Sequence, residues 1–386
     1  MTTMREAAAA AVTDKTAMPE NRKHLDYIDR LRLMAAFCVV FMHTAAEPIR
    51  LGFGADWELL NVCTSFSFTA VPLFFMISGY LLMSGSSTAD ISVLLKKRLP
   101  RLVVPLVLWS AAAILWIMYA QGDMRLRSFL SLSVHALSGP AFVHLWFMYA
   151  LIAMYAISPV LYAALHSLSR TGHIYVLSLI GLVLLRSAAS LLAPEPFDRL
   201  FDIDLINRLS LFGGHLCPFL LGYYLGSMKK RIPGRVLVCA SVLLLAFISV
   251  GTHILSHRSG EYIATLQSQN GFFEIALAAC LFLIFRQYAD KPLRLRAAAS
   301  AVPLLFPLYL MHNILLDIVI HRFSAPTGFA GTLGLSAIIF VLSLLILKTA
   351  ASLRPLCYAA TGLSYREASA SCSWVYSFKR LRQRDK

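Results

Sequence analysis

The stretch DRLRLMAAFCVVFMH, residues 29–43, decides the fold of this chain. It begins with three charged residues, continues through ten apolar or small positions and ends at a histidine. Arg32 is expected at a membrane surface, because charge is expensive in hydrocarbon. His43 would lie about 16 Å further along a helix, at about 1.5 Å per residue. The stretch therefore predicts a spanning helix that carries an imidazole into the bilayer.

The composition around this stretch is that of a polytopic membrane protein. The 386 residues are 58% hydrophobic and 14% charged, with a mean hydropathy of +0.68, which is too apolar for a soluble domain of this length. No alternation typical of barrel strands is present, so we expect an all-α fold of about ten transmembrane helices. The predicted spans are residues 30–48, 61–83, 99–120, 142–165, 173–193, 209–228, 234–255, 270–288, 299–320 and 329–352.

The distribution of lysine and arginine predicts the orientation. With a cytoplasmic N-terminus, the inner segments hold 27 of the 35 basic residues, as the positive-inside rule requires. Both termini are then cytoplasmic. The net charge of +15 mostly reflects this topology, with a secondary attraction to anionic membrane lipids. No basic groove with interleaved aromatic residues is present, so we expect no nucleic-acid partner.

One integral-membrane domain, residues 28–354, is predicted between an N-terminal tail, 1–27, and a basic cytoplasmic C-terminal tail, 355–386. The seven cysteines lie mostly within spans or on the inner tail, with no CxxC pair. Neither a disulfide framework nor a zinc site is indicated, and no metal is expected. The oligomeric state is left open.

Ionisable residues within the predicted spans are functional candidates, because each costs a few kcal/mol at membrane depth. Glu47 follows His43 by one turn and would share its helix face. By their depth in the predicted topology, these and further residues could line one polar cavity, although interhelical hydrogen bonds or interfacial positions would also explain them. The further residues are His144, His215, Glu274, His312 and Asp317.

Two arginines begin the third span, in RLPR. Arg98 and Arg101 are three residues apart, which places both guanidinium groups on one helix face and suits a grip on phosphate. Positive-inside topology is the alternative explanation. Arg32 could join them or pair with Asp29 on its own helix.

These residues lie in motifs that together resemble the acyltransferase 3 family of integral-membrane acyltransferases. The resemblance rests on five stretches in order, YIDRLRLMAAFCVVFMH, VPLFFMISGYLL, RLPR, HLWFMYALIAMYAISPVL and LYLMH. Within the family the chain is similar to short polysaccharide O-acetyltransferases, including the enterobacterial common antigen type. The resemblance implies a bacterial inner-membrane enzyme. It also implies acetyl-CoA as co-substrate, no permanently bound cofactor, and an envelope glycan or lipid-linked sugar as acceptor.

The resemblance and the chemistry of acyl transfer together suggest roles. His43 would be the base and Glu47 its orienting carboxylate. Coenzyme A phosphates would be held by Arg32, Arg98 and Arg101. Ser78 beside Gly79 would let the pantetheine arm pass, unless this small surface serves close helix packing. Acceptor or supporting roles fall to His144, Glu274, His312 and Asp317.

Two questions stay open at this point. Transfer could be direct or could pass through an acyl-histidine. Buried histidines and carboxylates could also relay protons in a transporter or flippase for a sugar lipid or acyl group.

Overall fold

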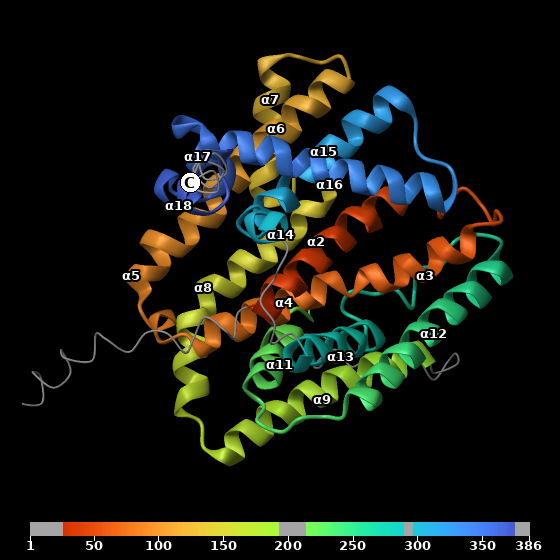
Figure 1. Cartoon of the computed structure of the whole chain (residues 1–386), viewed down its shortest axis with the longest axis vertical. Coiled ribbons are helices and arrows are strands. Elements are labelled where there is room, and N and C mark those ends of the chain that lie inside the picture. Colours follow the sequence, from red (N-terminus) through yellow and green to blue (C-terminus); the bar gives the residue numbers. More distant parts are fainter. Residues whose placement is uncertain (1–25, 193–213, 289–295, 375–386) are drawn as a thin grey trace, which may run out of the picture.

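The computed structural model describes residues 26–192, 214–288 and 296–374, and these residues form helices and no strand (Figure 1). Seven helical segments in this part of the chain are long and apolar enough to cross a membrane. The predicted all-α polytopic membrane fold is therefore confirmed. The seven segments are Trp57–Ser84, Ile91–Ala120, Leu126–Ser167, Arg170–Ser190, Gly234–Ser259, Ala299–Phe323 and Gly328–Ser352.

Three of the predicted spans correspond to helices that do not meet the same criteria. Helix α2 (Asp26–Ala45) carries too many charged residues near its start to count as an apolar spanning segment. Helices α11 (Leu216–Ser227) and α13 (Phe272–Tyr288) are too short, with 12 and 17 residues. The first part of the predicted span 209–228 lies outside the described residues. The count of ten thus stays a prediction, as do the sides on which the termini lie.

Helix α2 lies in the middle of the bundle, between α15 (Leu305–Phe323) and α16 (Gly328–Ser352) on one side and α3 (Trp57–Phe68) and α4 (Ala70–Ser84) on the other (Figure 1). Its first turn carries Asp26 and Asp29, whose charges complement the positive end of the helix dipole. Apolar side chains on all of its faces are buried, which explains why no amphipathic pattern marks this helix.

Helices α3 and α4 form one long segment with a break at Thr69. Pro72 causes this break, because it has no N–H to bond the carbonyl of Phe68 and its ring crowds that carbonyl. At the break, both the hydroxyl and the backbone N–H of Thr69 donate to the carbonyl oxygen of Phe66, at 2.6 and 3.3 Å.

Glycines allow α4 and α11 to pack backbone to backbone. A Cβ at Gly79 would overlap the carbonyl oxygen of Phe219, and a Cβ at Gly222 would overlap that of Met76. Small residues at a helix crossing are the usual device for close approach in membranes. The structure thus supports the close-packing interpretation of Gly79, beside half-buried Ser78.

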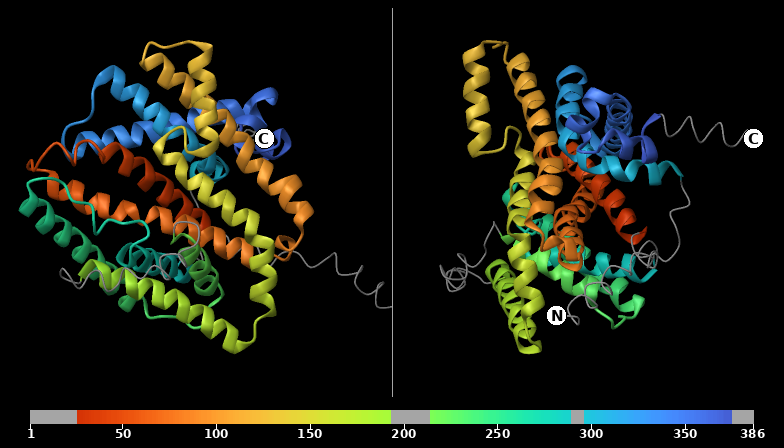
Figure 2. Two further views of the ribbon diagram at one scale, coloured as in Figure 1. Left: turned by 180° about the vertical axis from the view of Figure 1, so that it is seen from behind. Right: turned by 90° about the vertical axis from the view of Figure 1, so that its left-hand side faces the viewer.

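The other helices enclose this centre, as the two further views show (Figure 2). The longer ones are α6 (Leu99–Ala120), α7 (Leu126–Ser138), α8 (Trp146–Ser167), α9 (Arg170–Leu192) and α12 (Gly234–Ser259). The short ones are η1 (Ser86–Thr88), α5 (Ile91–Val93), η2 (Leu94–Arg98), η3 (Val143–Leu145), α14 (Arg296–Ala301) and η6 (Val302–Leu304).

The residues predicted as a C-terminal tail include two helices, α17 (Arg354–Thr361) and α18 (Tyr365–Ser371). They pack on α6 and α16. Trp109 donates its indole N–H to the carbonyl oxygen of Ala360 at 3.0 Å. Gly362 has a left-handed φ of 72°, and a Cβ there would overlap the carbonyl oxygen of Arg101. Residues 355–374 are thus docked on the bundle, whereas residues 1–25 lie outside the described part.

Candidate active site

Three of the predicted histidines meet inside the bundle. His43 comes from the last turn of α2, His144 from η3 and His312 from α15. The ring centroid of His43 lies 5.9 Å from that of His144 and 5.3 Å from that of His312, and the latter two are 5.1 Å apart. We call these three residues the histidine cluster.

His144 uses both of its ring nitrogens. Its Nε2 lies 3.2 Å from the carbonyl oxygen of Leu310, so this nitrogen carries the proton and donates it. Its Nδ1 accepts from the side-chain amide of Asn313 at 3.3 Å. The Tyr309 hydroxyl donates to the backbone carbonyl of His144. These bonds fix a neutral tautomer and leave no lone pair free for chemistry.

His312 has the opposite tautomer to His144, with its proton on Nδ1. Its Nδ1–H donates to the carbonyl oxygens of Tyr309 at 2.7 Å and Leu308 at 3.3 Å, one turn earlier on the same helix. Its Nε2 therefore carries a lone pair. This atom is buried and has no hydrogen-bond partner among the described residues. A buried acceptor without a partner is uncommon and calls for an explanation.

His43 faces both other rings and makes no hydrogen bond through its own ring within the described part of the chain. It is the one member of the histidine cluster that is partly exposed, whereas His144 and His312 are 2% and 0% exposed. His43 is thus the ring of the histidine cluster that no hydrogen bond fixes within the described residues.

The structure does not bring Glu47 or Asp317 to the histidine cluster. Helix α2 ends at Ala45, and Glu47 lies exposed in the following turn, without a hydrogen bond to His43. Asp317 is exposed on α15 and accepts from the indole N–H of Trp116 at 2.6 Å. Neither carboxylate orients a ring of the cluster.

Two more candidates lie in other surroundings. Glu274 is fully buried in α13, its two carboxylate oxygens have no hydrogen-bond partner among the described residues, and Tyr262 is an electrostatic neighbour. His215 is stacked between the rings of Phe75 at 4.6 Å and Trp146 at 5.0 Å. The stacking assigns His215 a packing role, although its buried Nδ1 has no hydrogen-bond partner among the described residues.

The arginines at the other end of α2 each have a different partner. Arg32 lies 3.7 Å from Asp29. Arg98 donates to the hydroxyls of Thr88 at 2.8 Å and Ser87 at 2.9 Å. Tyr155 of α8 interacts electrostatically with both Arg32 and Arg98.

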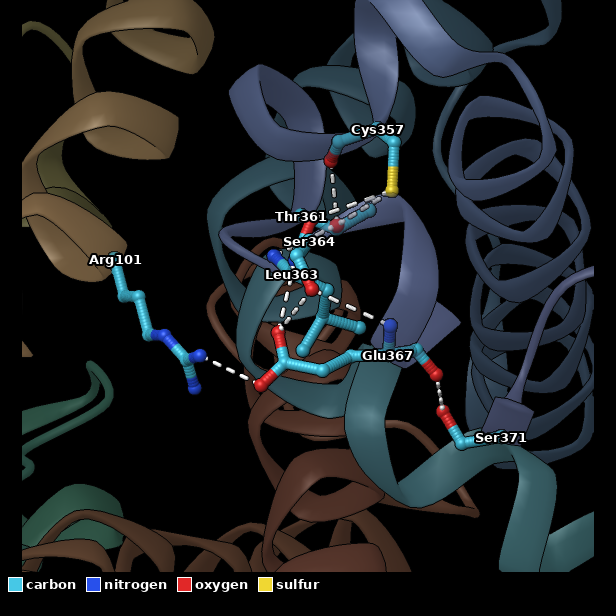
Figure 3. A network of polar contacts seen from close by, with 7 residues as sticks. All are labelled: Arg101, Cys357, Thr361, Leu363, Ser364, Glu367 and Ser371. Atoms are coloured by element: carbon cyan, nitrogen blue, oxygen red, sulfur yellow. Dashed lines mark hydrogen bonds and ion pairs between the residues drawn. The ribbon is translucent and has the colours of Figure 1, made fainter. Parts of the chain in front are cut away.

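Arg101 donates to the carboxylate of Glu367 at 2.6 Å (Figure 3). Arg98 is the last residue of a π-helical turn, η2, and its guanidinium binds Ser87 and Thr88 instead. The structure therefore does not place the two guanidinium groups on one ligand.

Glu367 is held from both sides. The backbone N–H and hydroxyl of Ser364 donate to it at 2.9 and 2.8 Å, in the capping box that begins α18 (Figure 3). Partial burial raises the pKa of this carboxyl, but the bonds from Ser364 and the Arg101 guanidinium outweigh burial and lower it below 4.5.

Sequence reasoning missed several residues of these sites. Asn313 and Tyr309 flank His312 on α15 and hold His144, and Tyr155 interacts electrostatically with Arg32 and Arg98. An asparagine in an apolar span is itself a signal, because its amide needs a partner there. The pair His253 and His257 was also passed over, although its i, i+4 spacing is visible in HILSH.

The helical bundle with apolar spans defines a polytopic membrane protein, and the buried histidine cluster is a candidate catalytic site. The family model described as an acyltransferase domain, Acyl_transf_3, matches residues 25–348. The chain belongs to the acyltransferase 3 family and is a membrane acyltransferase. No curated protein and no solved structure matches it.

Proposed function

We propose that this acyltransferase moves an acetyl group from cytoplasmic acetyl-CoA to a hydroxyl of an envelope polysaccharide or lipid-linked sugar, in a bacterial inner membrane. One observation carries the proposal. The unpartnered Nε2 of His312 lies in the bundle interior beside His43, whose ring centroid is 5.3 Å from that of His312. Acceptor groups without partners, deep among apolar helices, fit a site that removes a proton.

The chemistry requires a base, because a sugar hydroxyl is a poor nucleophile at neutral pH. In the proposed direct transfer, a ring nitrogen of His43 takes the hydroxyl proton as the oxygen attacks the thioester carbonyl. The new C–O bond forms, the C–S bond breaks, and the departing thiolate receives the proton from the His43 imidazolium. Atoms and charge balance without a further reactant.

His312 would stabilise the proton while it resides on His43. Two imidazoles that share an N–H···N bond of about 2.9 Å have centroids roughly 5 Å apart, which is close to the spacing found here. A protonated His43 could then donate to the Nε2 of His312. His144, fixed by Leu310 and Asn313, would support both rings without exchanging protons itself.

The donor would be held at the opposite end of α2. Two N–H groups of Arg98 donate to Ser87 and Thr88, so the guanidinium retains donors for a phosphate oxygen. Arg32, like Arg98, interacts electrostatically with Tyr155. Arg101 is engaged by Glu367 and would contribute only if that contact opened. The pantetheine arm would run past Ser78 on α4 towards His43.

Mass spectrometry of envelope polysaccharide tests the proposal. A host that lacks the chain would be complemented with the wild type, with His43→Ala, or with His321→Ala as a control. His321 is an exposed histidine on the same helix as His312. We expect O-acetyl groups with the wild type and the control and none with His43→Ala, at equal protein levels in the membrane.

Two results would overturn the proposal. Unchanged acetylation with His43→Ala would remove His43 from the chemistry. Loss of the polysaccharide itself from the surface, with acetylation of the remaining intracellular glycan intact, would favour transport of the sugar.

A further inference from the structure

A second group of histidines lies outside the histidine cluster, where the first turn of α3 packs on the last turns of α12. The Nδ1 of His253 lies 2.6 Å from the Oε1 of Glu58, and the Nε2 of His257 lies 3.8 Å from the same oxygen. The ligand atoms of all three side chains are within 4.8 Å of one another. We call these residues the outer triad.

The spacing of the outer triad suits one metal ion. Nitrogen and oxygen ligands at about 2.1 Å from a tetrahedral ion are about 3.4 Å apart. The two measured separations, 2.6 and 3.8 Å, lie on either side of this value. His253 and His257 are four residues apart on one helix, which is the spacing that lets two imidazoles share an ion.

We propose that the outer triad binds a divalent transition cation, Zn²⁺ in the first instance, which bridges α3 and α12. Two imidazole nitrogens and one carboxylate oxygen are ligands that zinc and its neighbours prefer, whereas Ca²⁺ and Mg²⁺ prefer oxygen ligands throughout. Three protein ligands leave a fourth tetrahedral position for water or another small ligand. The three side chains are partly or fully exposed, so an ion could enter from solvent.

The backbone under the outer triad is already in place. Asn61 of α3 donates to the carbonyl oxygen of Ser249 on α12 at 2.8 Å, about one turn from the triad on each helix. On the other side, the ring of Phe53 stacks on His257 with 4.1 Å between centroids. Binding would thus require rotation of side chains only, which lowers its entropic cost.

A cavity of about 500 Å³ is lined by residues that contact the outer triad, although not by the triad itself. Phe53 and Trp57 line this cavity and also contact the triad, Phe53 through His257 and Trp57 through both histidines. Trp57 is buried and donates its indole N–H to Ile49, which fixes the loop between α2 and α3. A bound ion would therefore stiffen the rim of the cavity.

Metal binding would change the hydrogen bonding of His253. Without metal, the Nδ1–H of His253 donates to Glu58. A metal ion at Nδ1 needs the lone pair of that nitrogen, so the proton would move to Nε2.

The experiment measures metal on the full chain, purified in detergent without a histidine tag, stripped with a chelator and dialysed against Zn²⁺. We expect about one zinc per chain. His253→Ala, His257→Ala and Glu58→Gln should each weaken binding at least about tenfold, since even indirect ligand partners cost that much. His135→Ala, an exposed histidine on α7, is the control and should bind as the wild type does.

Thermal unfolding supplies a second readout that does not depend on acyl transfer. Zn²⁺ should raise the Tm of the wild type and of His135→Ala, by stabilising the folded state that binds it. Ca²⁺ and Mg²⁺ at the same concentration should not. Zinc below one-tenth per chain, or equal binding by the Glu58→Gln variant, would overturn the proposal and leave a plain His253–Glu58 hydrogen bond.

Discussion

The two ends of α2 are built on different principles. At one end, the histidine cluster is fixed by backbone carbonyls and a buried amide, and two of its rings are almost fully buried. At the other end, the arginines are partly exposed and each binds its own partner. Preorganised groups control a rate, whereas separate contacts contribute affinity and stability in small increments. The same substitution, a deleted side chain, should therefore act differently at each end.

The largest effect is expected in the histidine cluster. His43→Ala and His312→Ala should each lower kcat about 10²–10⁴-fold, the range for loss of a general base, with the KM for acyl-CoA nearly unchanged. The measurement is steady-state acyl transfer by the purified protein in detergent. If the two rings act as a unit, the double variant should be no slower than the worse single variant.

The control for this prediction is His321→Ala, which should retain the wild-type rate. Additive losses in the double variant would show that the two rings act separately. Full activity in both single variants would show that the histidine cluster serves packing only. The two ends of α2 would then not differ in their effect on the rate.

The arginine end should respond through binding. Arg98→Ala removes a charged hydrogen-bond donor, for which about 1.5–3 kcal/mol is typical, so the KM for acyl-CoA should rise about tenfold or more at unchanged kcat. Arg101→Ala should raise KM less, because Glu367 already occupies its guanidinium.

Arg98→Lys is the conservative comparison and should recover part of the affinity, since lysine keeps the charge without the planar fork. Equal rises in KM for the Arg98 and Arg101 variants would instead support the shared phosphate grip that the spacing of RLPR suggests. A fall in kcat alone would mean that the arginines position the reacting groups.

Some features of these sites could be predicted from the sequence, and others could not. Depth along each span follows from counting residues, and it correctly placed His43, His144 and His312 at a similar level. Contact among them depends on tertiary packing, which no single sequence reveals. Seven of the predicted spans were readable from hydropathy, whereas the break at Thr69 and the docking of residues 355–374 were not.

Spacing along one helix does not reveal partners that come from other segments. Arg98 and Arg101 are three residues apart, yet Arg98 binds the hydroxyls of Ser87 and Thr88 and Arg101 binds the carboxylate of Glu367. Arg101 also has a partner 266 positions away, in a segment expected to be a tail. Glu58 and His253 lie 195 positions apart, so only the HILSH half of the outer triad was visible in the sequence.

A smaller effect is expected from the Arg101–Glu367 pair. Both side chains are more than 40% exposed, so a double-mutant cycle with Arg101→Ala and Glu367→Gln should give a coupling of about 1 kcal/mol or less. The pKa of Glu367 is lowered in the folded state. Its stabilising contribution should therefore be complete above pH 4.5 and should be lost as the pH falls through the folded pKa.

The measurement is the Tm of the wild type and of Glu367→Gln at neutral pH and at decreasing pH below 4.5. The difference between them should shrink in acid. A difference that persists in acid would assign the effect to the uncharged capping bonds of Ser364.

The smallest effect is expected for Glu47, because the role predicted from helical spacing disagrees with its position in the structure. Helical spacing predicts that Glu47 orients His43, in which case Glu47→Gln would slow transfer about as much as loss of an orienting partner, 10–100-fold. The structure ends α2 at Ala45 and leaves Glu47 exposed in the turn. We expect a change of about 0.5 kcal/mol at most, roughly twofold in rate, as for other surface substitutions. A loss as large as that of His43→Ala would mean that α2 extends by a turn when substrate binds. Glu47 would then reach the ring, and the contrast would lie between two states of α2 rather than between its two ends.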